Sequence, residues 1–65
     1  MTQIQPNVAP EGRYELKEAA AALQIDRSTL LRYTHRGKIR CGIRKSNGHR
    51  VWTGAEIIRL WRAEY

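Results

Sequence analysis

Residues 26–37, Asp-Arg-Ser-Thr-Leu-Leu-Arg-Tyr-Thr-His-Arg-Gly, decide the fold. Asp26 belongs to the residue types whose side chain caps the free amides at the start of a helix, and its charge favours the positive end of the helix dipole. Gly37 supplies the left-handed backbone conformation with which helices often end. These two residues therefore frame a predicted helix from Arg27 to about Arg36.

This predicted helix has a packing face and an outward face, because each residue rotates the helix by about 100°. Leu30, Tyr33 and Thr34 fall on one side and should contact the core. The outward set consists of Ser28, Leu31, Arg32, His35 and Arg36. The side of the helix that is offered to a partner is therefore basic.

A preceding helix is predicted from Leu16 to Leu23, where apolar residues recur at the i, i+3, i+4 and i+7 spacing of an amphipathic helix. Gln24 and Ile25 then form a short connection to Asp26. Two short helices joined by a few residues, the second one basic, are typical of a helix-turn-helix, a motif whose second helix fits the DNA major groove.

A β-hairpin is predicted to follow these helices. Apolar and polar residues alternate over residues 39–44, which indicates a half-buried strand. Its inward side chains are expected to be Ile39, Cys41 and Ile43. Asn47-Gly48 favours a tight two-residue turn, since such a turn needs positive φ at both central residues, and residues 49–52 should form the return strand.

Thr53 and Glu56 have the spacing of a capping box, which predicts a last helix. Its apolar face is expected to consist of Ile57, Ile58, Leu60 and Trp61. Residues 1–13 contain two prolines and a glycine without periodicity, so we expect a flexible leader followed by one domain over residues 14–65. The predicted fold class is mainly α with a small β-hairpin: a winged helix-turn-helix with a two-stranded wing and a C-terminal helix.

Basic side chains are concentrated in the middle of the chain. Lys and Arg number 12 against 6 Asp and Glu, a net charge of +6. Residues 27–50 contain no acidic side chain but eight basic ones: Arg27, Arg32, Arg36, Lys38, Arg40, Arg44, Lys45 and Arg50. Solvated surfaces normally mix both signs, so this segregation indicates a binding footprint for an acidic partner such as nucleic acid, an anionic membrane or an acidic protein. For Arg27, pairing with Asp26 or Glu18 is a rival explanation.

Several classes of protein are disfavoured. A chain of 65 residues forms one domain with a small core, and it carries no Ser-His-Asp or Cys-His signature, so we expect no enzyme activity. His35, Cys41 and His49 lack the spacing of a metal site, and we expect neither a metal nor a cofactor. A single cysteine, with no recognisable signal peptide or long apolar run, indicates a cytoplasmic protein without a membrane partner.

Four short blocks carry a family resemblance. They are Tyr-Glu-Leu-Lys-Glu-Ala-Ala (14–20), Ile-Asp-Arg-Ser-Thr-Leu (25–30), Gly-Lys-Ile (37–39) and Arg-Val-Trp-Thr-Gly-Ala-Glu-Ile (50–57). Their order and spacing resemble the MerR-like winged helix-turn-helix domains, including phage and plasmid excisionases. The resemblance implies that the second helix enters the major groove of double-stranded DNA, while the hairpin acts as a wing on the backbone or the adjacent minor groove.

The resemblance also implies individual DNA contacts. Those on the second helix are Arg27, Ser28, Thr29, Arg32 and Arg36, and those on the wing are Arg44, Lys45, Asn47, His49 and Arg50. His35 joins them through its outward position. Leu31 replaces an arginine that is usual in MerR regulators, which implies an apolar contact there, such as a thymine methyl group. The sequence stops at Tyr65, before the long dimerisation helix of those regulators, so excisionase-like modules are the closer resemblance.

Three functional hypotheses follow. The first is sequence-preferring binding of double-stranded DNA, in transcription regulation or as an accessory factor in recombination, with homodimers or cooperative arrays raising the affinity of a single domain. The alternative is a protein-interaction module whose last helix exposes Trp61 with Ile57 or Ile58 to a recombinase, terminase or polymerase. A third is binding of RNA or single strands through aromatic side chains. We expect the aromatic residues in the core instead: Tyr14, Tyr33, Trp52 and Trp61.

Overall fold

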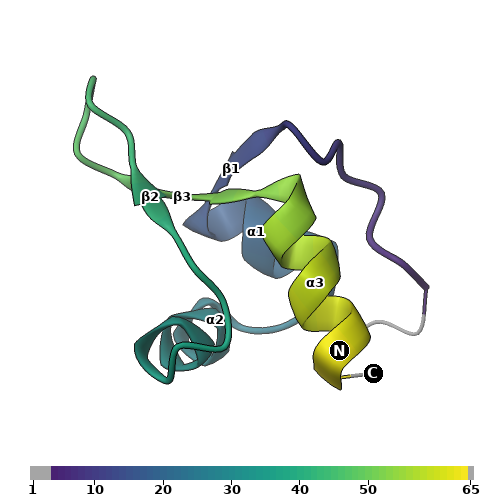
Figure 1. Cartoon of the computed structure of the whole chain (residues 1–65). Helices are drawn as coiled ribbons and strands as arrows, with labels where there is room; N and C mark the ends of the chain where they lie inside the picture. Colours follow the sequence, from purple (N-terminus) through teal and green to yellow (C-terminus); the bar gives the residue numbers. More distant parts are fainter. Residues whose placement is uncertain (1–3, 65) are drawn as a thin grey trace.

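The structure is a computed structural model that describes residues 4–64. Across these residues, three helices pack around a three-stranded antiparallel sheet (Figure 1). The helices are α1 (Leu16–Leu23), α2 (Arg27–His35) and α3 (Gly54–Glu64). The strands are β1 (Arg13–Glu15), β2 (Gly42–Ile43) and β3 (Arg50–Thr53), in the sheet order β1-β3-β2. The predicted fold class, mainly α with a small hairpin, is confirmed.

Strand β1 has no counterpart in the prediction from sequence. In the antiparallel register, Tyr14 lies opposite Trp52 and Glu15 lies opposite Val51. A three-residue strand is too short to show a period of two, and its partner β3 lies far away in the sequence. Because β3 pairs with β1 on one side and with β2 on the other, it ties the hairpin to the helical part of the molecule.

The core is built around Trp52, whose side chain is fully buried. The buried cluster draws on all three helices and on the segment after α2; it contains Ala19, Ala20, Leu23, Leu30, Ile39, Trp52, Ile57 and Leu60. The expected core position of Trp52 is confirmed. Tyr14, Tyr33 and Trp61 are half-buried and pack against the cluster.

The turn between α1 and α2 depends on Gln24, which has a left-handed backbone with a φ of 55°. The N–H groups of Gln24 and Ile25 donate to carbonyl oxygens in the last turns of α1. Asp26 follows at the N-cap of α2, but its exposed carboxylate makes no capping hydrogen bond, so the capping role predicted for this side chain is wrong. Its backbone carbonyl oxygen accepts the Leu30 N–H at 3.1 Å, which begins the helix without the side chain.

Helix α2 ends as predicted at Gly37, whose φ is 76°. The Gly37 N–H donates to the Thr34 carbonyl oxygen at 3.1 Å, and the Lys38 N–H donates to the Tyr33 carbonyl oxygen at 3.0 Å. This pair of bonds is the Schellman motif, which satisfies the last carbonyl groups of a helix. The chain then turns away from α2 toward the hairpin.

The hairpin departs from the prediction in two ways. Ile43 is 60% exposed instead of facing the core, because the hairpin projects beyond the helices (Figure 1). At the tip, Gly48 has a φ of 71°, but among residues 4–64 Gln24 is the one non-glycine with positive φ, so Asn47 lacks the predicted conformation. The Arg44 N–H donates to the His49 carbonyl oxygen at 2.9 Å, and the loop between these residues is longer than the predicted two-residue turn. Longer hairpin loops need fewer positive φ values than primed two-residue turns.

Helix α3 begins with half of the predicted capping box. The Thr53 hydroxyl oxygen accepts the Glu56 N–H at 3.3 Å, as expected. The Glu56 carboxylate does not return this bond and instead accepts the Arg40 N–H at 3.1 Å. Glu56 thus anchors the segment that leads into the hairpin.

The segment before β1 lies against the start of α3. Residues 1–3 fall outside the described residues, but the carbonyl oxygens of Pro10 and Gly12 accept the N–H groups of Ala55 and Gly54 at 3.1 and 3.0 Å. Arg13, assigned to the leader from the sequence, is the first residue of β1. Within residues 4–64, no helix combines the length and the apolar character needed to cross a membrane.

Candidate nucleic-acid interface

The outward face of α2 largely agrees with the prediction. Ser28, Arg32, His35 and Arg36 are all exposed. Leu31 differs, since it is half-buried and packs against the core cluster. It directly follows the buried Leu30 and therefore lies at the edge of the packing face rather than at the centre of the outward face. Thr29 is half-buried at the opposite edge.

Five cations on α2 and the hairpin have no acidic partner within residues 4–64. We call them the open cations: Arg27, Arg32, Arg36, Lys45 and Arg50. All five side chains are exposed. The rival explanation for Arg27, an ion pair with Asp26 or Glu18, finds no contact in the structure. The open cations are consequently available to an external anion.

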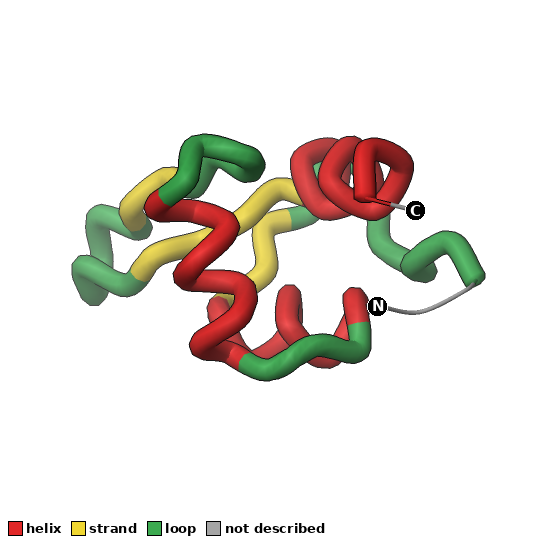
Figure 2. Tube along the Cα trace, turned by 90° about the horizontal axis from the view of Figure 1, so that it is seen from below, coloured by secondary structure: helices red, strands yellow, loops and turns green. Residues whose placement is uncertain are grey.

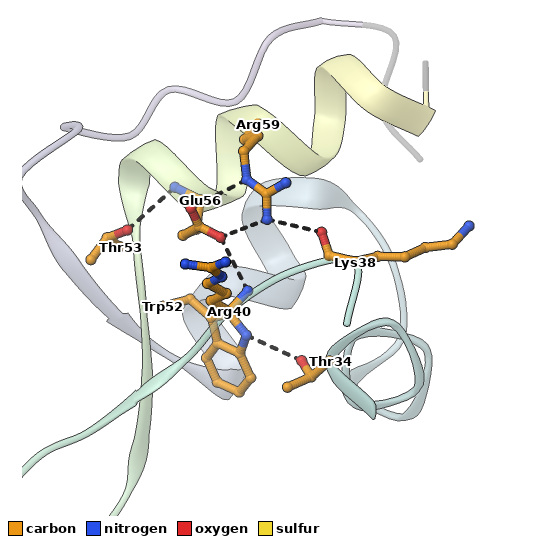
Figure 3. A network of polar contacts seen from close by, with 7 residues as sticks. All are labelled: Thr34, Lys38, Arg40, Trp52, Thr53, Glu56 and Arg59. Carbon is orange, nitrogen blue, oxygen red and sulfur yellow. Dashed lines mark hydrogen bonds and ion pairs between the residues drawn. The ribbon is translucent and has the colours of Figure 1, made fainter. Parts of the chain in front are cut away.

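Other cations are bound to acidic side chains where α3 meets the segment after α2. We call this region the junction: Lys38 and Arg59 are its ion-paired cations, Glu56 and Glu64 are its acidic residues, and Arg40 joins it through its backbone N–H. Lys38 Nζ lies 2.6 Å from Glu64 Oε1. The Arg59 guanidinium donates to both Glu56 carboxylate oxygens, at 2.8 and 3.2 Å (Figure 3). The hydrogen bond from Arg59 holds the pKa of the Glu56 carboxyl below its usual value, against the opposing effect of burial. The junction thus uses its cations to hold the fold together.

The inner side of α2 is fixed to the sheet by a short chain of hydrogen bonds. The Trp52 Nε1–H donates to the Thr34 hydroxyl oxygen at 3.3 Å (Figure 3). That hydroxyl in turn donates to the Leu30 carbonyl oxygen at 2.9 Å. Trp52 belongs to β3, so this chain fixes α2 to the strand that carries the hairpin. The position of the outward face relative to the hairpin follows from this connection.

The base of the hairpin is held by Glu15. His49 Nδ1 lies 2.9 Å from one carboxylate oxygen of Glu15, and an Arg44 guanidinium nitrogen lies 4.0 Å from the other. The hydrogen bond with His49, together with the charge of Arg44, lowers the pKa of Glu15, although burial opposes this shift. At the tip, the Asn47 side-chain oxygen accepts the His49 N–H at 2.9 Å. Three predicted wing contacts, Arg44, Asn47 and His49, therefore also shape the hairpin.

The two views agree on how these elements are distributed. Helix α2 and the hairpin tip lie toward one end of the molecule, and α3 lies toward the other (Figures 1 and 2). The open cations are carried by α2, its C-cap and the hairpin. Arg62, on α3, is an exposed cation at the opposite end and has no acidic partner within the described residues.

An open cavity of about 460 Å³ lies where the starts of α1 and α2 approach β3. Arg27 and Arg50, two of the predicted contacts, line it together with Lys17 of α1. Lys17 had no role in the prediction from sequence, because it falls outside the basic segment 27–50 and sits among acidic residues. Its place beside Arg27 and Arg50 depends on the fold.

Metal binding, base stacking on Trp52 and protein docking through Ile57 find little support in the described part of the chain. Within residues 4–64, no three His, Cys, Asp or Glu side chains gather into a group that could hold a metal ion. Trp52 has no exposed ring for base stacking, and Ile57 is fully buried, so it is not available for a docking partner. Of the other residues in that alternative, Trp61 packs partly against the core and Ile58 is half-buried.

Comparison with known proteins gives one finding. A protein family described as a helix-turn-helix domain matches residues 13–65. Neither the curated proteins nor the solved structures contain a significant match. The matched range begins at the first residue of β1 and includes α1, α2, the hairpin and α3.

Proposed function

This chain belongs to the helix-turn-helix domain family, which makes DNA its partner, and we propose that α2 enters the major groove of duplex DNA while the hairpin acts as a wing. The observation that carries the proposal is the set of open cations on α2 and the hairpin, which are exposed and have no acidic partner within residues 4–64. Cations without an internal partner can neutralise the phosphates of a nucleic acid. This contact favours binding because it releases counterions that were condensed on the DNA.

The proposed roles follow the position of each residue. Arg32 and Arg36 lie four residues apart on the exposed side of α2 and would reach base edges or phosphates in the groove, with Ser28, Thr29 and His35 beside them. Lys45 and Arg50 would contact the backbone from the hairpin, and Arg44, Asn47 and His49 would contribute while they also hold its shape. A half-buried Leu31 leaves at most the edge of its side chain for a thymine methyl group.

The cellular process belongs to the proposal as well. A domain of this kind serves transcription regulation, or recombination as an excisionase-like accessory factor, and the MerR-like resemblance of the four sequence blocks supports either use. A single domain reads one half-site, so we propose that homodimers or cooperative arrays supply further affinity on DNA.

The first test measures fluorescence anisotropy of labelled duplex DNA, single-stranded DNA and RNA with the purified chain at several salt concentrations. If the open cations neutralise about five phosphates, log K should fall with log salt with a slope of roughly −4 to −5. Binding to the duplex should be the strongest. A slope close to zero, or a preference for single strands, would contradict the proposal.

A matched pair of variants then tests the interface itself. Arg32→Gln and Arg62→Gln each remove one exposed guanidinium without an acidic partner, the first on α2 and the second on α3. We expect Arg32→Gln to weaken duplex binding about tenfold, in line with the loss of one good contact, and Arg62→Gln to leave it nearly unchanged. Equal effects of both changes would mean that net charge, not this surface, determines binding.

A further inference from the structure

The cavity beside α1 brings together cations from three elements of the fold. Lys17 is the second residue of α1, Arg27 is the first residue of α2 and Arg50 is the first residue of β3. All three side chains are exposed, and none has an acidic partner within residues 4–64. The volume of about 460 Å³ is open to solvent, so an external group can enter it.

The acidic residue at this cavity does not neutralise those cations. Glu15 lines the same cavity, but its carboxylate is engaged by His49 at 2.9 Å and lies 4.0 Å from Arg44. Lys17, Arg27 and Arg50 therefore keep their attraction for an anion from solution. Like charges that share a cavity repel one another, and this repulsion is relieved when an anion binds between them.

The floor of the cavity argues against recognition of a base. Leu16 and Trp52 contribute to its lining, but the Trp52 side chain is fully buried and presents no ring face for stacking. Three of the lining residues, Lys17, Arg27 and Arg50, carry cationic side chains, which suit an oxyanion. A phosphate group of a nucleic acid backbone has the matching charge and acceptor atoms.

From this arrangement we infer that the cavity holds one phosphate of the bound DNA strand, with Lys17 as a contact alongside Arg27 and Arg50. The inference rests on the proposed function, and it adds α1 to the surfaces that touch DNA. Phosphate contacts fix the orientation of a protein on the duplex without reading its sequence. A phosphate held between the starts of α1, α2 and β3 fixes the angle at which α2 meets the groove.

The test is Lys17→Gln in the full chain, compared with Lys17→Arg and with the Arg62→Gln control. For Lys17→Gln we expect the salt slope to become shallower by about 0.9, the contribution of one phosphate contact. The loss of affinity should be equal on two duplexes of unrelated sequence, because the contact is to the backbone. Lys17→Arg keeps the charge and should keep the slope. Thermal unfolding should show that each variant is folded.

The outcomes separate this inference from the proposed function. If Lys17→Gln keeps the slope of the unmodified chain while Arg32→Gln weakens binding, the phosphate site is wrong and the proposed function stands. If Lys17→Gln weakens binding to one duplex only, Lys17 contacts a base and the inference is likewise overturned. If the unmodified chain shows no salt-dependent binding of duplex DNA, both fail together.

Discussion

Two regions of this molecule gather cationic side chains and use them in opposite ways. At the junction, Lys38 and Arg59 are bound to Glu64 and Glu56, so their charges serve the fold. On α2 and the hairpin, the open cations face solvent without an acidic partner within residues 4–64. The two regions adjoin, because the segment that carries Lys38 directly follows α2 and its Lys38 N–H donates to the Tyr33 carbonyl oxygen.

The placement of a few acidic residues determines whether a cation stabilises the fold or stays available to a partner. The chain has 6 acidic residues against 12 basic ones, so one-to-one pairing leaves at least half of the cations without an internal partner. Glu56 and Glu64 are both on α3, which concentrates internal pairing there. The basic residues of α2 are left for an outside anion because no acid of the described chain reaches them.

The largest effect is expected from breaking the junction with Glu56→Ala. This change removes the acceptor of the Arg40 N–H and both oxygens that bind Arg59. Hydrogen bonds to a charged group of a partly exposed side chain suggest a loss of about 1 to 2 kcal/mol in the free energy of unfolding, measured in urea. Arg62→Ala on the same helix should stay within about 0.5 kcal/mol of the unmodified chain.

Glu56→Ala should leave the binding surface intact. At a temperature where the variant is folded, duplex affinity and salt slope should match those of the unmodified chain, since no open cation contacts Glu56. If the affinity of the folded variant falls as far as that of Arg32→Gln, the separation between the two regions does not hold.

A smaller effect is expected from acid. The pKa of Glu56 is lowered from 4.5 by the hydrogen bond from Arg59, so the stability that this carboxylate provides is present above about pH 4.5 and is lost as pH falls through the folded-state pKa. The melting temperature of the unmodified chain should therefore exceed that of Glu56→Ala by less at pH 3 than at pH 7. A gap of equal size at both pH values would show that ionised Glu56 does not stabilise the junction.

The sequence predicts those features that are determined within one helical turn. The left-handed φ of Gly37 and the hydrogen bonds beside it are enough to stop α2. Leu30 is buried because it lies on the packing face of the helix. Strand β1 and the exposure of Ile43 depend on residues far away in the chain, and no local pattern indicates them. The sequence shows the basic segment 27–50, but it does not show which of its cations pair with acidic side chains and which stay unpaired. Lys38 pairs with an acid 26 residues away, and His49 contacts one 34 residues away.

The smallest effects are expected at Asn47 and Gly48 of the hairpin loop, because neither residue carries a charge. Gly48 has a φ of 71°, and a Cβ there would meet no atom within 4 Å, so Gly48→Ala should cost only the backbone strain of about 1 kcal/mol. Asn47→Ala removes just the acceptor of the His49 N–H at an exposed position, which is worth about 0.5 kcal/mol.

Urea unfolding of these two tip variants distinguishes the observed loop from a primed two-residue turn. Such a turn would hold both residues at positive φ, where asparagine is better tolerated than alanine, so Asn47→Ala would cost backbone strain in addition to the hydrogen bond and its loss of stability would approach that of Gly48→Ala. In the observed loop only position 48 has a positive φ, so only there would an added side chain strain the backbone. Gly48→Ala should therefore be the more destabilising of the two variants. Salt slopes with duplex DNA should match in both variants, because Lys45 and Arg50 keep their charges.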